Sequence, residues 1–501
     1  MAASHGRRQG LSVAQAREAA MTADTSRLAT LMRQALMWSG LLLAAVILGV
    51  VGAKLSVILV AGLGIAIVGA AIVLAFPSLA LVGLFVLSFG MLPAVMIPGP
   101  VQDQMRNLIE VGLLSMAALL AARAFFDEKA SISELILPWA AFLVAWFLLW
   151  TVAFTRGYFI EQYPLAIPDA RKHFGWFMIV VAAFIERQRP WRLHSIVVAI
   201  ASILAVEMLV QAASGRLLLA QIYVFKAEAS EGSSIPRGTT WGAEYLMMYV
   251  VYYCVQRLSA SEEPRRLMNA MPLLVLNMAG LLCTFTRGIW VASLAGLFFL
   301  VLFSGPLRVR LALRLGIAAV VAVAIVLGLA AAGNKMADAV VGRALSYKEE
   351  GSRGTSLGAR FDENRQAIKP MTESFWTGLG HGGEYKTYLN PEDEFVEQAI
   401  YIHNGYFYIQ LKYGILGPLS LALLIGLVVW VSASVRKRIP PEDPWFWRSQ
   451  AGMGCMFAFA VNAVSSPVWL EFGPTMGLAC ALTHLAAARA HALQFFPLEK
   501  T

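Results

Sequence analysis

Charged residues are scarce in this sequence. Only 14% of the 501 residues are Asp, Glu, Lys or Arg, whereas 58% are hydrophobic. Soluble domains are about one quarter charged and about half apolar, because a fold in water has to cover its apolar surface. A chain with so little charge cannot do this. The composition therefore excludes a water-soluble protein and predicts a membrane protein.

Cysteine is also scarce, and its distribution excludes two further classes of protein. The four cysteines all lie inside apolar stretches rather than in loops: Cys254, Cys283, Cys455 and Cys480. Their spacing fits neither a disulfide framework nor a metal-binding motif. We therefore expect small core residues, and we expect no metal centre and no cofactor.

Long apolar runs fill most of the chain. About fourteen of them can cross roughly 30 Å of hydrocarbon as helices. They lie near residues 37–53, 55–76, 78–96, 108–122, 135–154, 174–184, 195–213, 241–255, 271–285, 289–303, 315–332, 415–435, 453–469 and 476–492. The runs predict an all-α polytopic membrane protein with about 12–14 transmembrane helices and one large periplasmic loop.

The basic residues account for the net charge of +9 and orient the chain. Lys and Arg are enriched in the short cytoplasmic loops of membrane proteins. When the runs are threaded alternately from a cytoplasmic N-terminus, five successive basic loops fall on the cytoplasmic side: Arg123 and Lys129; Arg187, Arg189 and Arg192; Arg257, Arg265 and Arg266; Arg308, Arg310 and Arg314; and Arg436, Lys437, Arg438 and Arg448. We therefore expect both termini in the cytoplasm and the protein in a bacterial inner membrane.

This threading divides the chain into five parts. They are a cytoplasmic N-terminal segment (1–36), an N-terminal transmembrane bundle (37–332), a large periplasmic loop (333–403), C-terminal transmembrane helices (404–492) and a cytoplasmic tail (493–501). Loops as long as 333–403 are usually functional or disordered. Its aromatic residues and its glycine-rich stretch at 378–383 favour a partly folded cap.

Two polar features at the predicted periplasmic side could carry chemistry. Arg287 stands in a very short turn between two apolar runs, where a guanidinium is costly unless it meets an anion or carbonyl groups. The alternative is an arginine that reaches to the lipid headgroups. His403 stands where the long loop re-enters the membrane, and a histidine can take up a proton near neutral pH. Its alternative is an ordinary interfacial histidine.

Taken together, these stretches resemble the superfamily of O-antigen ligases and O-antigen polymerases. The turn Thr286-Arg287-Gly288-Ile289-Trp290 is similar to the family's Ser/Thr-Arg-Gly-x-Trp turn, and His403-Asn404-Gly405 to the His-Asn at the end of its periplasmic loop. Three further stretches match it in the same order: Pro236-Arg237-Gly238, Gly358-Ala359-Arg360 and the glycine-rich 377–382. The similarity covers roughly residues 237–469.

The resemblance implies a metal-independent glycosyltransferase. Such an enzyme transfers a glycan from an undecaprenyl-diphosphate carrier to an acceptor hydroxyl at the periplasmic face. A ligase uses lipid A-core as the acceptor in lipopolysaccharide biosynthesis, whereas a polymerase joins carrier-linked repeats of an O-antigen or exopolysaccharide. The sequence does not distinguish a ligase from a polymerase, and the ligase is our first choice. The implied partners are the carrier-linked glycan donor, the glycan or lipid A-core acceptor and membrane lipids, with no nucleic acid.

The resemblance also assigns roles to single residues. Arginines present paired donors to phosphate oxygens, so Arg287 is the first candidate for the diphosphate of the leaving group, followed by Arg237 and Arg360. His403 is the candidate base for the acceptor hydroxyl, or it orients the acceptor. Weaker candidates are His381, for which a solvated loop histidine is the alternative, and Asn404. We interpret the acidic run 392–394 as solvated rather than as a cation site.

A secondary transporter is the main alternative from another class. Acidic residues within apolar runs, here Glu110, Glu207 and Glu244, can couple transport to ions. The two halves of the chain show no convincing repeat, however, and transport gives no reason for a long loop that ends in His-Asn. A scaffold without activity would leave Arg287 without a role.

The predicted topology can be tested with two introduced cysteines. In intact cells with a permeabilised outer membrane, Ser356→Cys should react with a membrane-impermeant thiol reagent, and Ser261→Cys should not. The opposite labelling pattern would place the long loop in the cytoplasm and overturn the site assignment.

Overall fold

The structure is a computed structural model. It describes residues 68–89, 92–93, 99–126, 132–214, 219–220, 242–260, 264–345, 356–388, 396–399 and 401–496. The chain divides into two units, Met1–Ala75 and Phe76–Thr501. In the first unit, the helix Val68–Ala75 lies within the described residues. The predicted cytoplasmic segment 1–36, the run 37–53 and Arg237 lie outside them.

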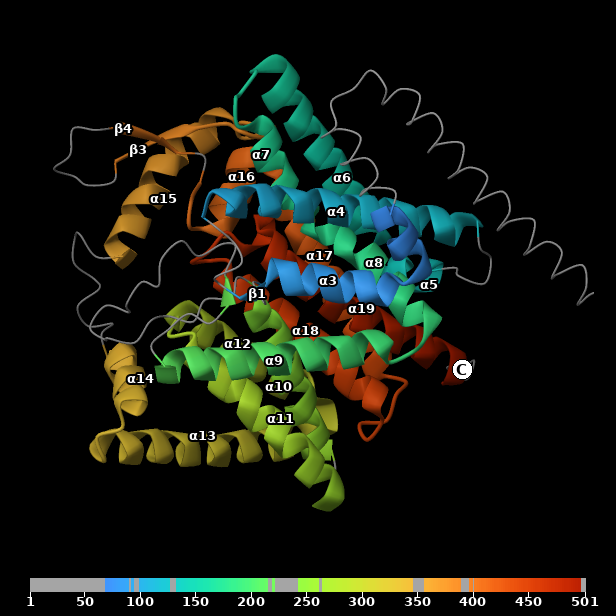
Figure 1. The fold of residues 1–501 in the computed structure, drawn as a ribbon, viewed down its shortest axis with the longest axis vertical. Helices are drawn as coiled ribbons and strands as arrows, with labels where there is room; N and C mark the ends of the chain where they lie inside the picture. Colours follow the sequence, from blue (N-terminus) through green and yellow to red (C-terminus); the bar gives the residue numbers. More distant parts are fainter. Residues whose placement is uncertain are drawn as a thin grey trace, which may run out of the picture. The chain divides into compact units, whose positions relative to one another are not determined.

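The second unit is built from α-helices (Figure 1). They are α3 (Pro77–Ser88), α4 (Gly99–Phe126), α5 (Ser133–Ile136), α6 (Ala140–Phe154), α7 (Ala166–Lys172), α8 (Met178–Gln188), α9 (Arg192–Ser214), α10 (Ala243–Ala260), α11 (Pro264–Cys283), α12 (Arg287–Phe303), α13 (Arg308–Ala331), α14 (Lys335–Leu345), α15 (Ser356–Glu373), α16 (Gly405–Tyr413), α17 (Leu416–Arg436), α18 (Pro444–Asn462) and α19 (Phe472–Phe495). The prediction of an all-α polytopic membrane protein is confirmed, and each apolar run from residue 78 onward overlaps a helix.

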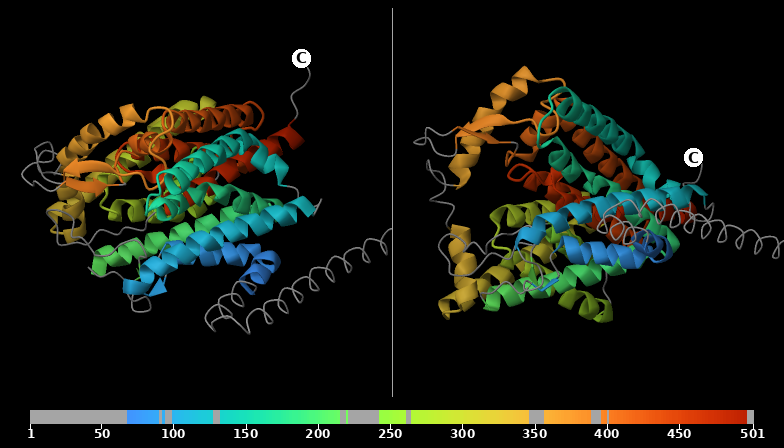
Figure 2. Two further views of the ribbon diagram at one scale, coloured as in Figure 1. Left: turned by 90° about the horizontal axis from the view of Figure 1, so that it is seen from above. Right: turned by 45° about the horizontal axis from the view of Figure 1, so that its top comes forward.

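Short pieces of other structure join these helices. The π-helical turn η4 (Thr155–Ile160) continues α6, and the 3₁₀ turn η5 (His173–Phe177) joins α7 to α8. The strands β1 (Leu92–Pro93) and β2 (Leu219–Ala220) pair antiparallel. The strands β3 (Tyr385–Tyr388) and β4 (Val396–Ala399) also pair antiparallel, beside α15 (Figure 2).

Four helical stretches of the described chain are long and apolar enough to cross a membrane. They are Ser133–Ile160, Arg192–Ser214, Arg308–Ala331 and Leu416–Arg436. Other apolar helices are shorter, among them Asn269–Cys283 and Arg287–Phe303. The protein is therefore a multi-pass membrane protein, and the count of about 12–14 spans stays a prediction.

Helix α18 lies in the core of the bundle and packs against α10, α12, α17 and α19. Glycine permits the closest approaches. A Cβ on Gly296 would lie 2.2 Å from the hydroxyl oxygen of Tyr252, and one on Gly454 would lie 2.8 Å from a ring carbon of that tyrosine. Small residues serve this purpose in lipid, where helices associate mainly through close packing. All four cysteines are unpaired and buried, which confirms them as core residues.

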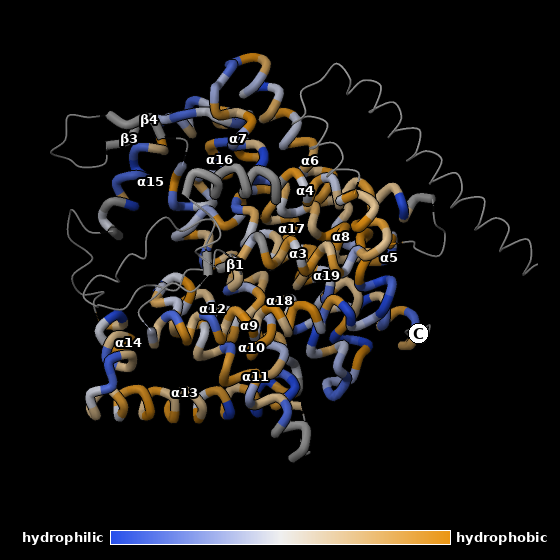
Figure 3. The backbone as a smooth tube through the Cα atoms, viewed as in Figure 1, coloured by the Kyte–Doolittle hydropathy of each residue, from blue (hydrophilic) through white to orange (hydrophobic). Residues whose placement is uncertain are grey.

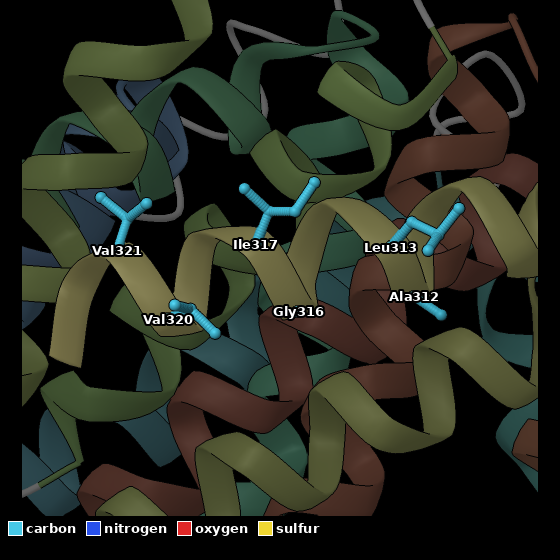
Figure 4. Close-up of a pocket in the computed structure, with 6 residues that line it drawn as sticks. All are labelled: Ala312, Leu313, Gly316, Ile317, Val320 and Val321. Carbon is cyan, nitrogen blue, oxygen red and sulfur yellow. The ribbon is translucent and has the colours of Figure 1, made fainter. Parts of the chain in front are cut away.

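Helix α13 is apolar along nearly its whole length and little covered by protein (Figure 3). Among its 24 residues, which are all described, Leu311 alone is buried. Leu313, Ile317 and Val321 point to one side of the helix beside a shallow open hollow (Figure 4). A helix with apolar side chains exposed all around its axis is suited to contact with lipid chains.

Several basic residues of the predicted cytoplasmic loops lie within helices, among them Arg123, Arg187, Arg308 and Arg448, and of these four Arg448 alone is buried. Arg448 belongs to α18 and is fully buried, with its Nη2 atom 2.6 Å from Oε1 of Glu186. Its guanidinium also lies 4.5 Å from the ring centre of Trp191 and 4.4 Å from that of Trp445. The placement of Arg448 in a loop was therefore wrong. An acidic partner and two aromatic faces compensate its burial in α18.

Candidate functional site

The glycine-rich turn of the long loop is docked into the helical bundle by backbone hydrogen bonds. The N–H groups of Leu379 and Gly380 donate to the carbonyls of Leu411 and Lys412, over 2.6 and 3.1 Å. The N–H of His381 donates to the carbonyl of Ala153 over 3.0 Å. The turn thereby joins the end of α16 to the end of α6.

Glycine is required in this turn for two reasons. Gly378, Gly380 and Gly382 have φ angles of 64°, 84° and 75°, a region that side chains disfavour. A Cβ on Gly378 would also lie 2.4 Å from the backbone of Lys412. The sequence pattern that resembled the family's glycine turn thus corresponds to a tight contact between the loop and α16.

A buried carboxylate lies under the turn. Asp169, on α7, accepts hydrogen bonds from the Tyr408 hydroxyl to Oδ1 over 2.7 Å and from the Gly382 N–H to Oδ2 over 2.8 Å. The ammonium of Lys412 lies 3.0 Å from Oδ2 and also donates to the carbonyl of Gly383 over 2.8 Å. Both charged side chains are fully buried. The pair therefore ties α7, α16 and the glycine-rich turn together.

Two histidines complete this buried cluster. Nδ1 of His381 lies 3.8 Å from Oδ2 of Asp169, and Nε2 of His173 lies 4.0 Å from Oδ1. His173 also contacts the hydroxyl of Tyr413 through its other ring nitrogen. Both imidazoles are fully buried, so the alternative that His381 is a solvated loop histidine was wrong.

Among the described residues, Asp169, His173 and His381 are grouped closely enough to hold a metal ion. The surroundings of Asp169 favour a different interpretation. Its oxygens already accept from Tyr408 and Gly382 and face the Lys412 ammonium, so the compensating positive charge comes from the chain. A divalent cation beside Lys412 would add uncompensated charge in a buried place.

The electrostatics of the cluster agree with this interpretation. Burial raises the pKa of the Asp169 carboxyl, but Lys412 together with His381 and His173 outweighs burial and holds that pKa well below its usual range. Burial lowers the pKa of His381, although Asp169 opposes the shift. The cluster is thus a carboxylate–ammonium pair with histidines kept neutral by burial.

His403 lies outside this cluster and has a carboxylate partner of its own. Nδ1 of His403 and its backbone N–H both lie 2.9 Å from Oε2 of Glu363, on α15. A carboxylate can only accept, so the nitrogen that faces it carries the proton. Nε2 of a neutral His403 is then the basic atom. The His403 side chain is 43% exposed and that of Glu363 14%, so a substrate can reach the imidazole.

Further polar groups surround this pair. The hydroxyl of Tyr385 donates to the Tyr401 carbonyl over 2.9 Å and lies 3.4 Å from Oε1 of Glu363. Burial and the carboxylates of Glu471 and Glu363 raise the pKa of Tyr401, whereas Arg360 opposes the shift. Arg360 precedes Glu363 by three residues on α15, so the two share a helix face. The structure thus brings Arg360 into the surroundings of His403.

Arg287 is the first residue of α12, in a turn between α11 and α12. The following residue, Gly288, packs on the end of α18, where an added Cβ would lie 3.1 Å from Oδ1 of Asn462 and 3.2 Å from the hydroxyl of Ser465. Asn462 in turn donates to the hydroxyl of Tyr245 at the start of α10, over 2.7 Å.

The turn after His403 packs on the same part of α18. The N–H of Gly405 donates to the carbonyl of Ala463 over 2.7 Å, and the Tyr406 hydroxyl donates to the carbonyl of Ala460 over 2.8 Å. Residues 460–466 therefore support both the Arg287 turn and the His403 turn. They also bring together the N-terminal ends of α12 and α16, which carry partial positive charge.

The structure does not bring all of the predicted site residues together. Arg287, Arg360 and His403 are brought to one end of the bundle. Asn404 is the N-cap of α16, where its side chain accepts from the N–H groups of Tyr406 and Phe407, a structural role. Arg237 and the acidic run 392–394 lie outside the described residues.

Sequence reasoning missed Glu363, Asp169 and Lys412. Glu363 carried one available signal, because its spacing of three residues from Arg360 places both on one side of a helix. The sequence contained no signal for Asp169 and Lys412, since they are far apart in the chain and their contact depends on how the helices pack.

Two acidic residues that could have favoured transport have hydrogen-bond partners. Glu207 accepts from the side-chain amide of Gln211 over 2.6 Å, and Glu244 accepts from the N–H of Gly242 over 2.8 Å. These contacts give both residues a structural role. The side chain of Glu110 lies outside the described parts of the structure.

Comparison with known proteins agrees with the motif resemblance. Residues 272–422 match the family model of O-antigen ligase. The matched stretch includes Arg287, Arg360, His381 and His403, and it ends within α17. No protein with a curated description matches the chain.

Removing one partner of the buried pair should destabilise the protein. Lys412→Met leaves the Asp169 carboxylate buried without its counter-ion, which costs about 3–5 kcal/mol, and it should lower the unfolding temperature of the purified protein. Asp169→Asn/Lys412→Met should recover part of the loss. The pKa of Asp169 is lowered in the folded state, so this stabilisation is present above the ordinary carboxyl pKa and disappears as the pH falls below it.

Lys369→Gln is the control, because Lys369 lies 3.9 Å from Glu373 in an exposed pair and such pairs contribute little. A chelator should leave the unfolding temperature unchanged if Lys412 supplies the positive charge. Unchanged stability of Lys412→Met would show that the pair does not anchor the turn, and strong destabilisation by the chelator would indicate a metal instead.

Proposed function

We propose that the protein is a glycosyltransferase of the O-antigen ligase type, from the premise that residues 272–422 match the family model of O-antigen ligase. It transfers a glycan from undecaprenyl diphosphate to a hydroxyl of lipid A-core at the periplasmic face of the inner membrane. The observation that carries the proposal is the His403–Glu363 pair, which shares the support of α18 with the Arg287 turn.

In the proposed reaction, His403 acts as the base. Nε2 accepts the proton of the acceptor hydroxyl while the hydroxyl oxygen forms a bond to the anomeric carbon of the donor sugar. Glu363 holds Nδ1 protonated and stabilises the imidazolium that forms. The imidazole needs to be reached from outside, and its exposure of 43% allows this.

The leaving group is the carrier diphosphate. As the bond between the anomeric carbon and the phosphate oxygen breaks, the electron pair stays on that oxygen and negative charge develops there. Arg287 stabilises this charge with paired N–H donors, and the N-terminal end of α12 contributes partial positive charge. Arg360 and Arg237 are further candidates for the diphosphate. These steps require only side-chain and backbone groups of the chain.

The proposal includes the topology. The loop 333–403 is the periplasmic cap between the bundle 37–332 and the C-terminal helices 404–492, with 1–36 and 493–501 in the cytoplasm. The folded content of α14, α15 and the β3–β4 hairpin supports a cap in this loop. A polymerase would use the same site with a carrier-linked repeat as the acceptor.

The His403–Glu363 pair predicts a specific loss of activity. His403→Gln should lower the transfer rate by about a hundredfold or more, because a general base contributes at least that factor. Glu363→Gln should lower it by about tenfold or more, since a side-chain amide can donate to Nδ1 and favour the wrong tautomer. The measurement is transfer from a carrier-linked glycan by purified protein.

Glu373→Gln is the matched control, on the same helix but in an exposed pair, and it should retain wild-type transfer. Transfer at the wild-type rate by folded His403→Gln protein would rule out this residue as the base.

A second prediction separates charge from geometry at Arg287. Arg287→Lys should be nearly as inactive as Arg287→Ala, because lysine keeps the charge but lacks the fixed fork of donors. If Arg287 only anchors a helix end to headgroups, lysine reaches them equally well and activity persists. Robust transfer by the Lys variant would therefore refute the diphosphate clamp. Loss of wild-type transfer in chelator would refute metal independence.

A further inference from the structure

Helix α15 has two faces of opposite character. On one side, Phe361 and Ile368 are 64% and 49% exposed, and a spacing of seven residues places them on the same face of a helix. The exposed residue Arg365 lies between them on that face. The opposite side carries Glu363, the partner of the candidate base, and the buried Ala367. We call Phe361, Arg365 and Ile368 the α15 stripe, because they point away from the candidate site.

The loop that follows α15 is bound to the ends of two candidate spans. The carbonyl of Phe375 accepts from the N–H of Ile415 over 2.8 Å, and Ile415 directly precedes the span formed by α17. The carbonyl of Gly378 accepts from the guanidinium of Arg156, which lies four residues before Ile160, the end of another span. One span begins and the other ends here, so the loop after α15 lies at the level of one membrane surface.

Large apolar side chains are exposed at this level. Trp376 is 72% exposed and packs edge-on against Phe375, with 5.1 Å between the ring centres. Phe159 and Ile160 at the end of one span, and Leu416 at the start of the other, are exposed as well. Tryptophan is enriched where a membrane meets water, because its ring is apolar and its N–H is polar. These residues therefore mark a place at which the protein meets the headgroup region.

The orientation and charge of α15 suit the same surroundings. The helix lies crosswise to the long helices α9 and α13 (Figure 1), which are both candidate spans, so it runs along the membrane surface rather than through the membrane. Interfacial helices bury an apolar face between headgroups and acyl chains and bind lipid phosphates with cations. The exposed charged residues of α15 are Arg365, Lys369 and Glu373. Lys369 and Glu373 lie 3.9 Å apart and balance each other, which leaves Arg365 as the net positive charge.

We propose that the α15 stripe docks on the phospholipid surface at this end of the bundle. Phe361 and Ile368 enter the border between headgroups and acyl chains, and Arg365 binds lipid phosphates. The docking follows from the exposed face, the neighbouring spans and the charge, and it does not depend on the reaction. Its consequence rests on the proposed function: since Glu363 lies on the opposite face of α15, the membrane surface sets the height at which Glu363 meets His403.

The test measures lipid contact of single residues in the full-length protein, in nanodiscs of phosphatidylcholine and phosphatidylglycerol. The four native cysteines are buried, so an introduced cysteine can be labelled with a fluorophore. The label on Ile368→Cys should be quenched by lipids with a doxyl group near the headgroup and protected from aqueous iodide. Doxyl quenching should be about twofold or more stronger than for Glu373→Cys, which lies on another side of the helix. Val320→Cys, on the exposed span α13, is the reference for full lipid contact.

A charge in the stripe provides a second variant. Phe361→Asp should lift the helix from the headgroups, because a carboxylate is costly at this border and is repelled by anionic lipids. Doxyl quenching of the Ile368→Cys label should then fall, and its quenching by iodide should rise. Unchanged quenching in this variant would show that Phe361 does not hold the helix on the lipid.

Other outcomes overturn the proposal in distinguishable ways. Strong iodide quenching of the Ile368→Cys label without doxyl quenching would place the stripe in water. Protection from both quenchers, with two copies of the chain in each nanodisc, would assign the stripe to contact with a second copy. If Ile368→Cys does not fold, Phe361→Cys has to show the same pattern of lipid contact.

The result is separate from the test of transfer. If the label reports lipid contact but the purified wild-type protein transfers no glycan, the proposed function fails and the docking of α15 stands. If the protein transfers the glycan and the label reports water, the docking alone fails.

Discussion

The ion pair between Asp169 and Lys412 is the interaction on which the position of the candidate site depends. It is fully buried, so each charge would be very costly without the other. The pair lies where three distant segments meet: α7, the glycine-rich turn of the long loop and the C-terminal end of α16. His403 directly precedes Asn404, the N-cap of α16, so the helix that is held by Lys412 at one end has the candidate base next to its other end.

The site therefore depends on contacts of two kinds. Around Asp169, buried charges and backbone hydrogen bonds fix the loop and α16, with no room for side chains at the glycines. Around His403 and Arg287, the side chains are only partly buried and can meet a substrate. The proposed transfer between two large substrates requires a rigid support beneath an accessible surface, because the reacting groups have to be positioned while the glycans remain outside.

Much of this could be predicted from the sequence. The apolar runs from residue 78 onward predicted the apolar helices of the bundle, and the run at 289–303 differs from α12 by two residues at its start. Short motifs also selected Arg287 and His403, and the turns beside both residues pack at the end of α18. Their roles in catalysis stay a prediction. Glu363 was missed because its spacing of three residues from Arg360 on α15 is common on polar helices and not diagnostic of a site. Arg448 was placed wrongly because a count of charges does not reveal that Glu186, Trp191 and Trp445 surround it.

The end of α18 bears on the distance between the leaving phosphate and the attacking oxygen in the proposed reaction. Residues 460–466 carry the Arg287 turn on one side and the Gly405 turn on the other, so a single helix end sets the span between the leaving-group side and the base. Neither turn can shift without moving against this common support. Under the proposed function, this support would allow wide variation in the sugars beyond the exchanged bond and would require one fixed length from the phosphate to the attacking oxygen.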